Sequence, residues 1–289
     1  MTPPPTFGIV IPTYNAEQHL ARLVASIKVQ EGPSYSIAVV DQSSEDRTVD
    51  LARSLGCIVI EVPKSASYTP PGINRNFGSE LAQGEILLHL DADMELGSTD
   101  FLFKLAALFD AEHQAVIIEE HDIAYGFWST CKAVERTCYR GTSMESARAV
   151  TRSLFQAIGG YSERIASGED FFIASQYGTR TKVVRAPSIA LRHNLGHSTL
   201  RSLLKKKFSY GRSSKPYLQS AKAAGSMSGV SLVLRSVNAY IRNWKLLKSQ
   251  PFAYLAVFPL RSMELVAMLL GMWLAPTEPA PRPSVPSQK

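Results

Sequence analysis

Cysteine is scarce in this chain of 289 residues, and the few cysteines present form no paired pattern. They are Cys57, Cys131 and Cys138, an odd number without CxxC spacing. We therefore expect reduced thiols in a cytosolic compartment, with neither a disulfide framework nor a zinc site. Cys131 and Cys138 lie in a predicted helix, where core packing is the simplest role for a thiol.

Three common sequence signals are also missing. Residues 1–6 contain neither a basic nor an apolar region of a signal peptide, so the catalytic part is expected to face the cytoplasm. The first predicted strand is followed by Pro12-Thr13-Tyr14-Asn15 instead of GxGxxG, which disfavours a nicotinamide-dependent Rossmann enzyme. The sequence has no GxxxxGK[ST] motif, which disfavours a P-loop ATPase.

Acidic residues are missing from one long segment. Residues 201–248 contain eleven lysines and arginines and no Asp or Glu. The rest of the chain has 20 basic against 25 acidic residues, although the whole chain carries a net charge of +6. A molecule with its charge divided in this way is expected to place its basic part on an anionic surface.

Four short apolar runs rich in β-branched residues predict buried strands, each separated from the next by a segment of helical periodicity. The predicted strands are residues 7–12, 36–40, 57–62 and 85–90. This order predicts an α/β fold, namely a Rossmann-like, mostly parallel sheet with helices on both faces. Ligands of such sheets bind beyond the carboxyl ends of the strands, so residues 12–15, 41–46 and 91–93 are expected to share one crevice.

The alternation becomes less regular after residue 100. Helical patterns at residues 101–112 and 125–139 flank a predicted strand at 115–119. A further helix is expected to begin at Gly168-Glu169-Asp170, and residues 181–192 predict two short strands. These elements are expected to complete the same domain.

Two carboxylates directly follow the fourth predicted strand. Asp91 and Asp93 flank Ala92 at the end of an apolar run. Carboxylates so placed can hold a hard divalent cation whose remaining ligands are water and phosphate. A helix cap or a solvated turn would explain the pair equally well in isolation. Its position at the ligand-binding edge of the sheet favours the cation site.

An ordered series of motifs makes the assignment more specific. The motifs are Ile9–Asn15 (IVIPTYN), Val39–Ser44 (VVDQSS), Asn74–Gly78 (NRNFG), Gly84-Glu85, Asp91–Asp93 (DAD), Gly159–Tyr161 (GGY) and Gly168–Asp170 (GED). Together they closely resemble the family 2 glycosyltransferases, which have a GT-A fold. The resemblance covers about residues 7–215. It implies an inverting transfer from a nucleotide-sugar donor. We expect UDP rather than GDP in that donor, and a hydroxyl or phosphate group as the acceptor.

The resemblance also assigns a donor site to this chain. The residues that it places against the nucleotide sugar are Pro12, Thr13, Tyr14, Glu17, Asp41, Ser43, Arg75, Asp91, Ala92 and Glu169. A carboxylate such as Asp41 can accept hydrogen bonds from a base N–H or a ribose hydroxyl, and Tyr14 could support the base. A turn role for Asp41 and a surface position for Arg75 are the alternatives.

A divalent cation, Mn²⁺ or Mg²⁺, is the cofactor that the resemblance implies. It would neutralise the leaving diphosphate as a Lewis acid. Asp93 is the expected direct ligand, while Asp91 is expected to contact metal or ribose. His193 is the candidate third ligand and His197 its competitor, although a lone histidine is more often structural.

One general base is needed beside the acceptor hydroxyl of an inverting transfer. The resemblance assigns this role to Asp170, with Glu169 against donor or acceptor sugar. Helix capping by Asp170 or Ser167 is the alternative. Phe171-Phe172 stands where relatives often carry another acidic residue or Trp, which leaves the acceptor pocket undefined. Residues 145–148 resemble a stretch near the acceptor.

The C-terminal part is predicted to meet a membrane. Residues 230–247 form a basic amphipathic pattern with Trp and Tyr on the apolar side, which fits either an interfacial helix or a core-facing one. Residues 252–275 are long enough to span a bilayer, but Pro259, Arg261 and Glu264 disfavour a simple span. We expect a shallow helical hairpin at the surface.

These patterns divide the chain into a catalytic domain (1–215), a membrane-associating segment (216–275) and a disordered proline-rich tail (276–289). The expected partners are a lipid-linked or membrane-located acceptor and an anionic membrane, at the cytoplasmic face of the cell membrane. A membrane-bound nucleotide-sugar binder without catalysis is the alternative function. Nucleic-acid binding is disfavoured because the predicted sheet lacks an aromatic platform.

Overall fold

The structure is a computed structural model of the whole chain. It describes residues 4–63, 71–142, 145–163, 165, 168–213 and 238–275. Some predicted features lie outside the described residues. They are the tail at 276–289, residues 230–237 of the expected helix 230–247, and Ser167.

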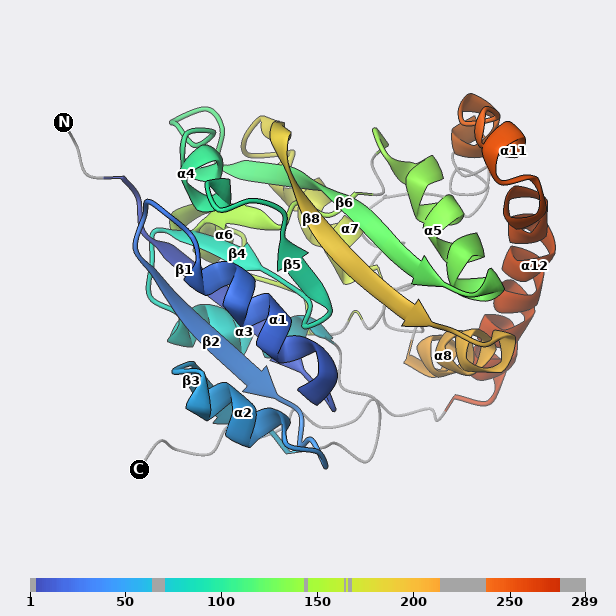
Figure 1. Cartoon of the computed structure of the whole chain (residues 1–289), viewed down its shortest axis with the longest axis horizontal. Coiled ribbons are helices and arrows are strands. Elements are labelled where there is room, and N and C mark those ends of the chain that lie inside the picture. The colour runs from blue at the N-terminus through green and yellow to red at the C-terminus, as the bar shows by residue number, and fades with distance from the viewer. Residues whose placement is uncertain are drawn as a thin grey trace.

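The centre of the molecule is an eight-stranded sheet with the order β3-β2-β1-β4-β7-β6-β8-β5 (Figure 1). The strands are β1 Phe7–Thr13, β2 Tyr35–Asp41, β3 Ile58–Glu61, β4 Ile86–His89, β5 Met94–Leu96, β6 Ala115–Tyr125, β7 Ala149–Thr151 and β8 Val183–His197. The four predicted strands are confirmed, and they pair in parallel. The second half is mixed, because β7 runs antiparallel to β4 and β6, and β5 runs antiparallel to β8.

Helices cover both faces of this sheet, with α1 and α3 on opposite sides of β1 (Figure 1). The helices are α1 Glu17–Lys28, α2 Thr48–Ser54, α3 Pro71–Leu81, α4 Phe101–Ala106, α5 Phe127–Tyr139, α6 Arg152–Ala157, α7 Glu169–Tyr177, α8 Leu200–Ser213, α11 Leu246–Ser249 and α12 Pro251–Trp273. Strand alternation explains this layering, because Ile9 and Ile11 pack with α1 while Val10 points to α3. A Cβ on Gly78 of α3 would lie 2.4 Å from Val10 Cγ1, so glycine lets α3 approach the sheet.

Two strand predictions were wrong in extent. The strand expected to end at residue 119 continues to Tyr125, and the two short strands expected within 181–192 are one strand, β8. Strands β6 and β8 pair in parallel along their length. The backbone hydrogen bonds of this pairing extend β6 through polar residues that local sequence did not predict to be strand. Pro187 does not interrupt β8, because it lies where the pairing register with β6 shifts. Its missing N–H therefore costs no ladder hydrogen bond with that strand.

The helical predictions also need correction. The helix expected over residues 101–112 ends at Ala106, after the last buried residue of its face. The hairpin expected over 252–275 is instead one continuous helix, α12. Its charged residues Arg261 and Glu264 do not break it, because they pair with each other at 3.2 Å and with α5.

Candidate active site

The loops that follow β1 and β2 are held together by a buried carboxylate. Asp41 accepts hydrogen bonds from Thr13 Oγ1 at 2.8 Å, Ser44 N at 2.7 Å and Ser44 Oγ at 2.6 Å. The carboxylate is fully buried. Asp41 therefore orders the edge where a nucleotide was predicted to bind, and its direct contact with that nucleotide stays a prediction.

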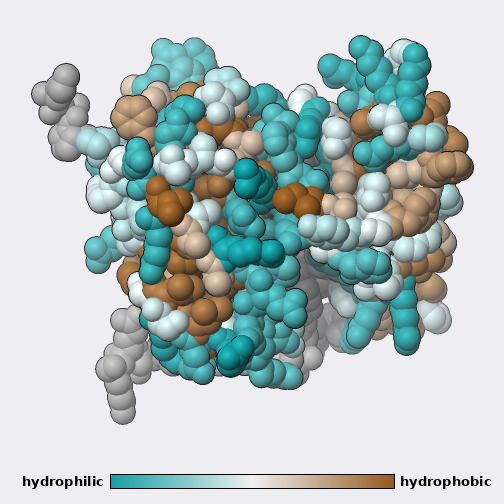
Figure 2. All heavy atoms as spheres, viewed as in Figure 1, coloured by the Kyte–Doolittle hydropathy of each residue, from teal (hydrophilic) through white to brown (hydrophobic). Residues whose placement is uncertain are grey.

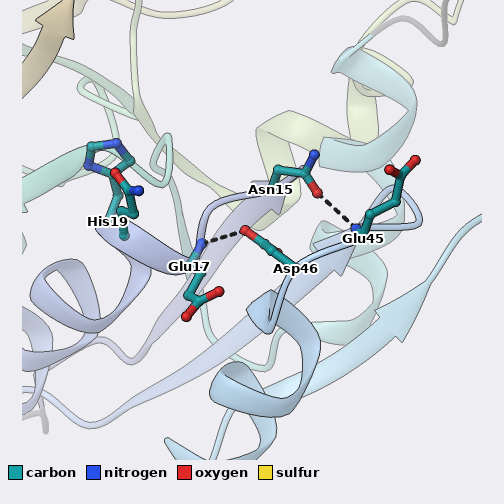
Figure 3. Close-up of a pocket in the computed structure, with 6 residues that line it drawn as sticks. Asn15, Glu17, His19, Glu45 and Asp46 are labelled. Atoms are coloured by element: carbon teal, nitrogen blue, oxygen red, sulfur yellow. Dashed lines mark hydrogen bonds between the residues drawn. The ribbon is translucent and has the colours of Figure 1, made fainter.

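A shallow cavity of about 490 Å³ lies beside these two loops (Figure 3). Its lining residues are Asn15, Glu17, Gln18, His19, Glu45 and Asp46. Figure 3 shows the loops joined by hydrogen bonds from Glu45 N to Asn15 Oδ1 (2.8 Å) and from Glu17 N to Asp46 (3.2 Å). The Glu17 carboxylate is paired with Arg47. This cavity is at the predicted nucleotide edge, but the aspartates of the DAD motif do not line it.

The other predicted nucleotide residues lie around the same edge. Pro12 and Thr13 end β1, and Tyr14 follows them with 46% of its surface exposed. Ser43 has a φ of +53° and donates a hydrogen bond to Val62 O at 2.9 Å. The structure thus brings the predicted donor residues of β1 and β2 together, as expected for the carboxyl ends of parallel strands.

Asp91 lies between two buried arginines. Its Oδ1 accepts a hydrogen bond from Arg75 at 2.8 Å, and its Oδ2 accepts one from Arg148 at 3.0 Å. Burial alone would raise the pKa of Asp91, but the two guanidinium groups hold it far below its usual range. Asp91 is therefore a permanent carboxylate whose two oxygens are both used by the protein.

Asp93 lies beside the imidazole of His193. His193 Nε2 is 3.3 Å from Asp93 Oδ1, while His193 Nδ1 is 2.9 Å from Glu120 Oε2. Pairing of β5 with β8 produces this approach, because Met94 is opposite His193 in the ladder. Burial would lower the pKa of His193, but hydrogen bonds with Asp93 and Glu120 raise it to about 9. At neutral pH His193 thus carries a proton between two carboxylates.

The Asp93–His193 pair fits a divalent cation. Carboxylate oxygen and imidazole nitrogen both bind such ions. Two ligand atoms at about 2.1 Å from one ion lie about 3 Å apart when the angle between them is near 90°, which matches the 3.3 Å between Asp93 Oδ1 and His193 Nε2. A ligating imidazole is neutral, so a cation would replace the shared proton. The competitor His197 lies instead beside Gly126.

Sequence reasoning missed Glu120, Asp122 and Arg136. Glu120 accepts a hydrogen bond from Arg148 Nε at 2.6 Å and pairs with Arg136, which in turn bonds Asp122 at 2.8 Å. Glu120, Asp122 and His193 have ligand atoms within 4.8 Å of one another. Both carboxylates are already paired with arginines. Glu120 contacts Nδ1 of His193, and this contact orients the imidazole so that its Nε2 faces Asp93. Acids at two alternate positions of β6 were the available signal.

The predicted base lies at the start of α7. Arg75, which binds Asp91, also reaches Glu169 at 3.0 Å and Asp170 at 3.6 Å. The residue before the helix is Gly168, with a φ of +82°, and Asp170 forms no cap. Among the described residues, Asp170 Oδ1 is buried without a hydrogen-bond partner. Burial and the charge of Asp170 raise the pKa of Glu169 to about 7.

The family of the chain follows from comparison with known proteins. Residues 8–169 match the model of "Glycosyl transferase family 2". The chain belongs to this family. The prediction from the ordered motifs is confirmed.

Two known glycosyltransferases are similar in sequence to part of this chain. A "PGL/p-HBAD biosynthesis glycosyltransferase" of Mycobacterium tuberculosis is 31% identical over 173 residues, which cover 55% of this chain and 64% of that protein. The poly(ribitol-phosphate) beta-N-acetylglucosaminyltransferase TarS of Staphylococcus aureus is 29% identical over 118 residues, or 39% of this chain and 20% of that one. The chain thus spans less than two thirds of these relatives.

Solved structures confirm the fold of this family 2 glycosyltransferase. The mannosyltransferase PcManGT from Pyrobaculum calidifontis, in complex with GDP-Man and Mn²⁺, aligns with a TM-score of 0.62 at 15% identity over 94% of this chain and 88% of that one. S. aureus TarS 1-349 in complex with UDP aligns with a TM-score of 0.52 at 19% identity over 71% and 64%. The predicted GT-A architecture is therefore correct.

Proposed function

We propose that the protein transfers a sugar, with inversion, from a nucleotide-diphosphate sugar to a hydroxyl of a membrane-located acceptor. One observation carries this proposal. Arg75 joins Asp91, beside the Asp93–His193 pair, to the Glu169–Asp170 pair. A donor half and a base are thereby held at a fixed spacing by one buried guanidinium.

The donor half would consist of the loop edge around Asp41 and the Asp93–His193 pair. Bound Mn²⁺ or Mg²⁺ would neutralise charge on the departing diphosphate. Asp93 and His193 are the residues that would hold the cation, and Asp91, fixed between two arginines, would contact ribose or cation-bound water. Structural relatives bound to UDP and to GDP-Man with Mn²⁺ support a donor of this class. We propose UDP ahead of GDP.

Asp170 would act as the general base. Its side chain is partly exposed, and its Oδ1 accepts no hydrogen bond from the described residues, so the carboxylate can accept the proton of an incoming hydroxyl. As that proton moves to Asp170, the acceptor oxygen forms its bond to the anomeric carbon and the nucleoside diphosphate leaves with the bonding electrons. Arg75 and Glu169 would position this carboxylate. Attack on the face opposite the leaving group inverts the anomeric centre.

The acceptor would be a lipid-linked glycan or glycolipid. The basic segment 201–248 supports such an acceptor. Anionic head groups attract clustered lysines and arginines.

Substitution of the two key carboxylates tests the proposal. A thermal-shift screen of UDP and GDP sugars with Mn²⁺ first identifies the stabilising donor. Asp170→Asn is then expected to lower kcat by about 10²–10⁴-fold while donor binding is kept. Asp93→Asn is expected to abolish both transfer and the effect of Mn²⁺ on donor binding, because a ligand is lost.

Asp110→Asn serves as the matched control and should retain full activity. Asp110 is an exposed carboxylate in the loop before the start of β6, whereas Glu120 lies towards the end of that strand. Full activity of either site variant would remove that residue from its role. Donor binding without turnover, on every lipid acceptor tried, would instead identify a non-catalytic binder.

A further inference from the structure

The helix α12 has two different faces. Its buried residues are Ala253, Tyr254, Val257, Leu260, Glu264 and Gly271. The opposite face exposes large apolar side chains along the whole helix, which are Phe252, Leu255, Phe258, Leu265, Val266, Leu269, Leu270 and Trp273. Figure 2 shows apolar atoms along the edge of the molecule where α12 lies. An apolar strip about 34 Å long needs a covering partner.

Charged residues are absent from the exposed face of α12. Its two charged residues, Arg261 and Glu264, turn toward the protein and pair with Glu135 at 3.0 Å and Lys132 at 3.2 Å of α5. In residues 238–275 the other charged side chains are the exposed cations Arg242, Lys245 and Lys248, next to the start of α12. Apolar face and flanking cations together match a bilayer of anionic lipids.

The packing of α12 decides how it can meet that bilayer. By length and composition it is the helix, among the described residues, that could cross a membrane. Its inner face, however, is locked to α8, because a Cβ on Gly271 would lie 2.1 Å from Phe208 O and one on Gly211 would lie 2.0 Å from Met268 O. A spanning α12 would draw α8 and the charged residues of α5 into hydrocarbon, at a cost of several kcal/mol per charge.

We infer that α12 lies in the plane of an anionic bilayer, with its apolar face submerged and its inner face fixed to the catalytic domain. This inference concerns the docking surface and does not rest on the reaction proposed above. Trp273 at one end and Phe252 at the other, 79% and 80% exposed, suit the interface between head groups and acyl chains.

The docking surface also constrains the position of the active site. The helix α5 packs on α12 through Cys131, Val134 and Cys138, and its Arg136 reaches Glu120 and Asp122 in the site. Only the helix α5 therefore lies between α12 and the catalytic centre among the described residues. The axes of two packed helices such as α5 and α12 are about 10 Å apart. An acceptor held in the same bilayer would need its hydroxyl to project from the lipid surface.

Vesicle flotation of the full chain, without donor or acceptor, tests the docking surface. Wild type is expected to float with phosphatidylcholine–phosphatidylglycerol (7:3) vesicles and to bind at least tenfold less to phosphatidylcholine alone. Leu255→Glu/Leu269→Glu should reduce binding to the anionic vesicles at least tenfold, because both side chains lie at the centre of the exposed face. Val29→Glu changes an equally exposed apolar residue at the end of α1, a helix that lies away from α12 (Figure 1), and this variant should bind as wild type.

Equal vesicle binding by the double variant would overturn the inference. So would a concentration-dependent dimer of wild type that does not bind vesicles, because the covering partner would then be a second copy. Donor-binding assays on the same samples keep these outcomes separate from a failure of the proposed reaction.

Cysteine labelling separates an in-plane helix from a spanning one. Gln250→Cys and Leu274→Cys, each in a Cys57→Ser background, place one thiol at either end of α12. In inside-out membrane vesicles from expressing cells, a membrane-impermeant maleimide should label both positions. Labelling of only one end before permeabilisation would show that the helix spans.

Discussion

Two buried arginines organise the active site at the residue level. Arg75 joins Asp91 to the Glu169–Asp170 pair, and Arg148 joins Asp91 to Glu120. Burying an ion pair contributes little net stability, because desolvation offsets the Coulomb attraction. The benefit here is geometric, since each carboxylate is held at a defined distance from its neighbours. That rigidity is what a site for displacement chemistry requires.

Glu169→Gln is expected to change the pH dependence of transfer. In wild type, burial and the adjacent charge of Asp170 raise the pKa of Glu169 to about 7, so the pair keeps an extra proton below that pH. Because the base works only as a carboxylate, activity should rise with pH through this range. The neutral amide removes one of the two charges, so the acidic limb should move to lower pH.

The measurement is the pH profile of kcat/KM for both proteins. Asp110→Asn, which changes an exposed acid outside this pair, should leave the acidic limb in place. An unshifted limb in Glu169→Gln would contradict the assignment of the titration to the Glu169–Asp170 pair.

Among the secondary-structure elements, the helices α5, α8 and α12 determine how the C-terminal part packs on the catalytic domain. The helix α5 offers Cys131, Val134 and Cys138 to α12, which confirms the expected packing role of these two thiols. The helices α8 and α12 cross with a glycine from each at the contact, Gly211 and Gly271. Small residues let helix backbones approach closely, so the crossing depends on these two positions.

Gly271→Ala is expected to lower the free energy of unfolding by about 1–3 kcal/mol, the usual cost of overpacking. The added Cβ would meet Phe208 O at 2.1 Å, and a backbone atom cannot move aside cheaply. Urea denaturation measures the change. Gly178→Ala is the control, since its Cβ would have no neighbour closer than 3.5 Å. Equal stability of the two variants would show that α8 and α12 are not closely packed in solution.

Hydrophobic packing crosses the predicted domain boundary at residue 215. Tyr240, Val257 and Leu260 share one hydrophobic cluster with Cys131 and Cys138. Residues 238–275 therefore pack against the catalytic domain through α5. Burial of this cluster contributes to the stability of both parts, because apolar area is removed from water on each side.

Deletion of residues 216–289 is accordingly expected to lower the Tm of the remaining domain by several degrees and to promote its aggregation. The apolar face of α5 would be exposed to water. Deletion of residues 276–289 alone retains α12 and should leave the Tm within about 1–2 °C of wild type. Differential scanning calorimetry compares the three proteins. An unchanged Tm after the longer deletion would show that residues 1–215 fold independently.

Local patterns alone were enough to locate many parts of this protein. The first four strands, the DAD motif at a strand end and the order of the family motifs depend on short-range periodicity and turn chemistry, which a linear sequence records. The family itself was recognisable on the same basis. Those features need no knowledge of distant neighbours.

Other features were decided only by the tertiary structure. The choice of His193 over His197 as the neighbour of Asp93 depends on the pairing of β5 with β8. The roles of Glu120 and Arg148 depend on contacts across β6, β7 and β8. The single helix α12 persists because α5 neutralises its charges. Each of these results from residues far apart in the chain, whose pairing energies no local pattern contains.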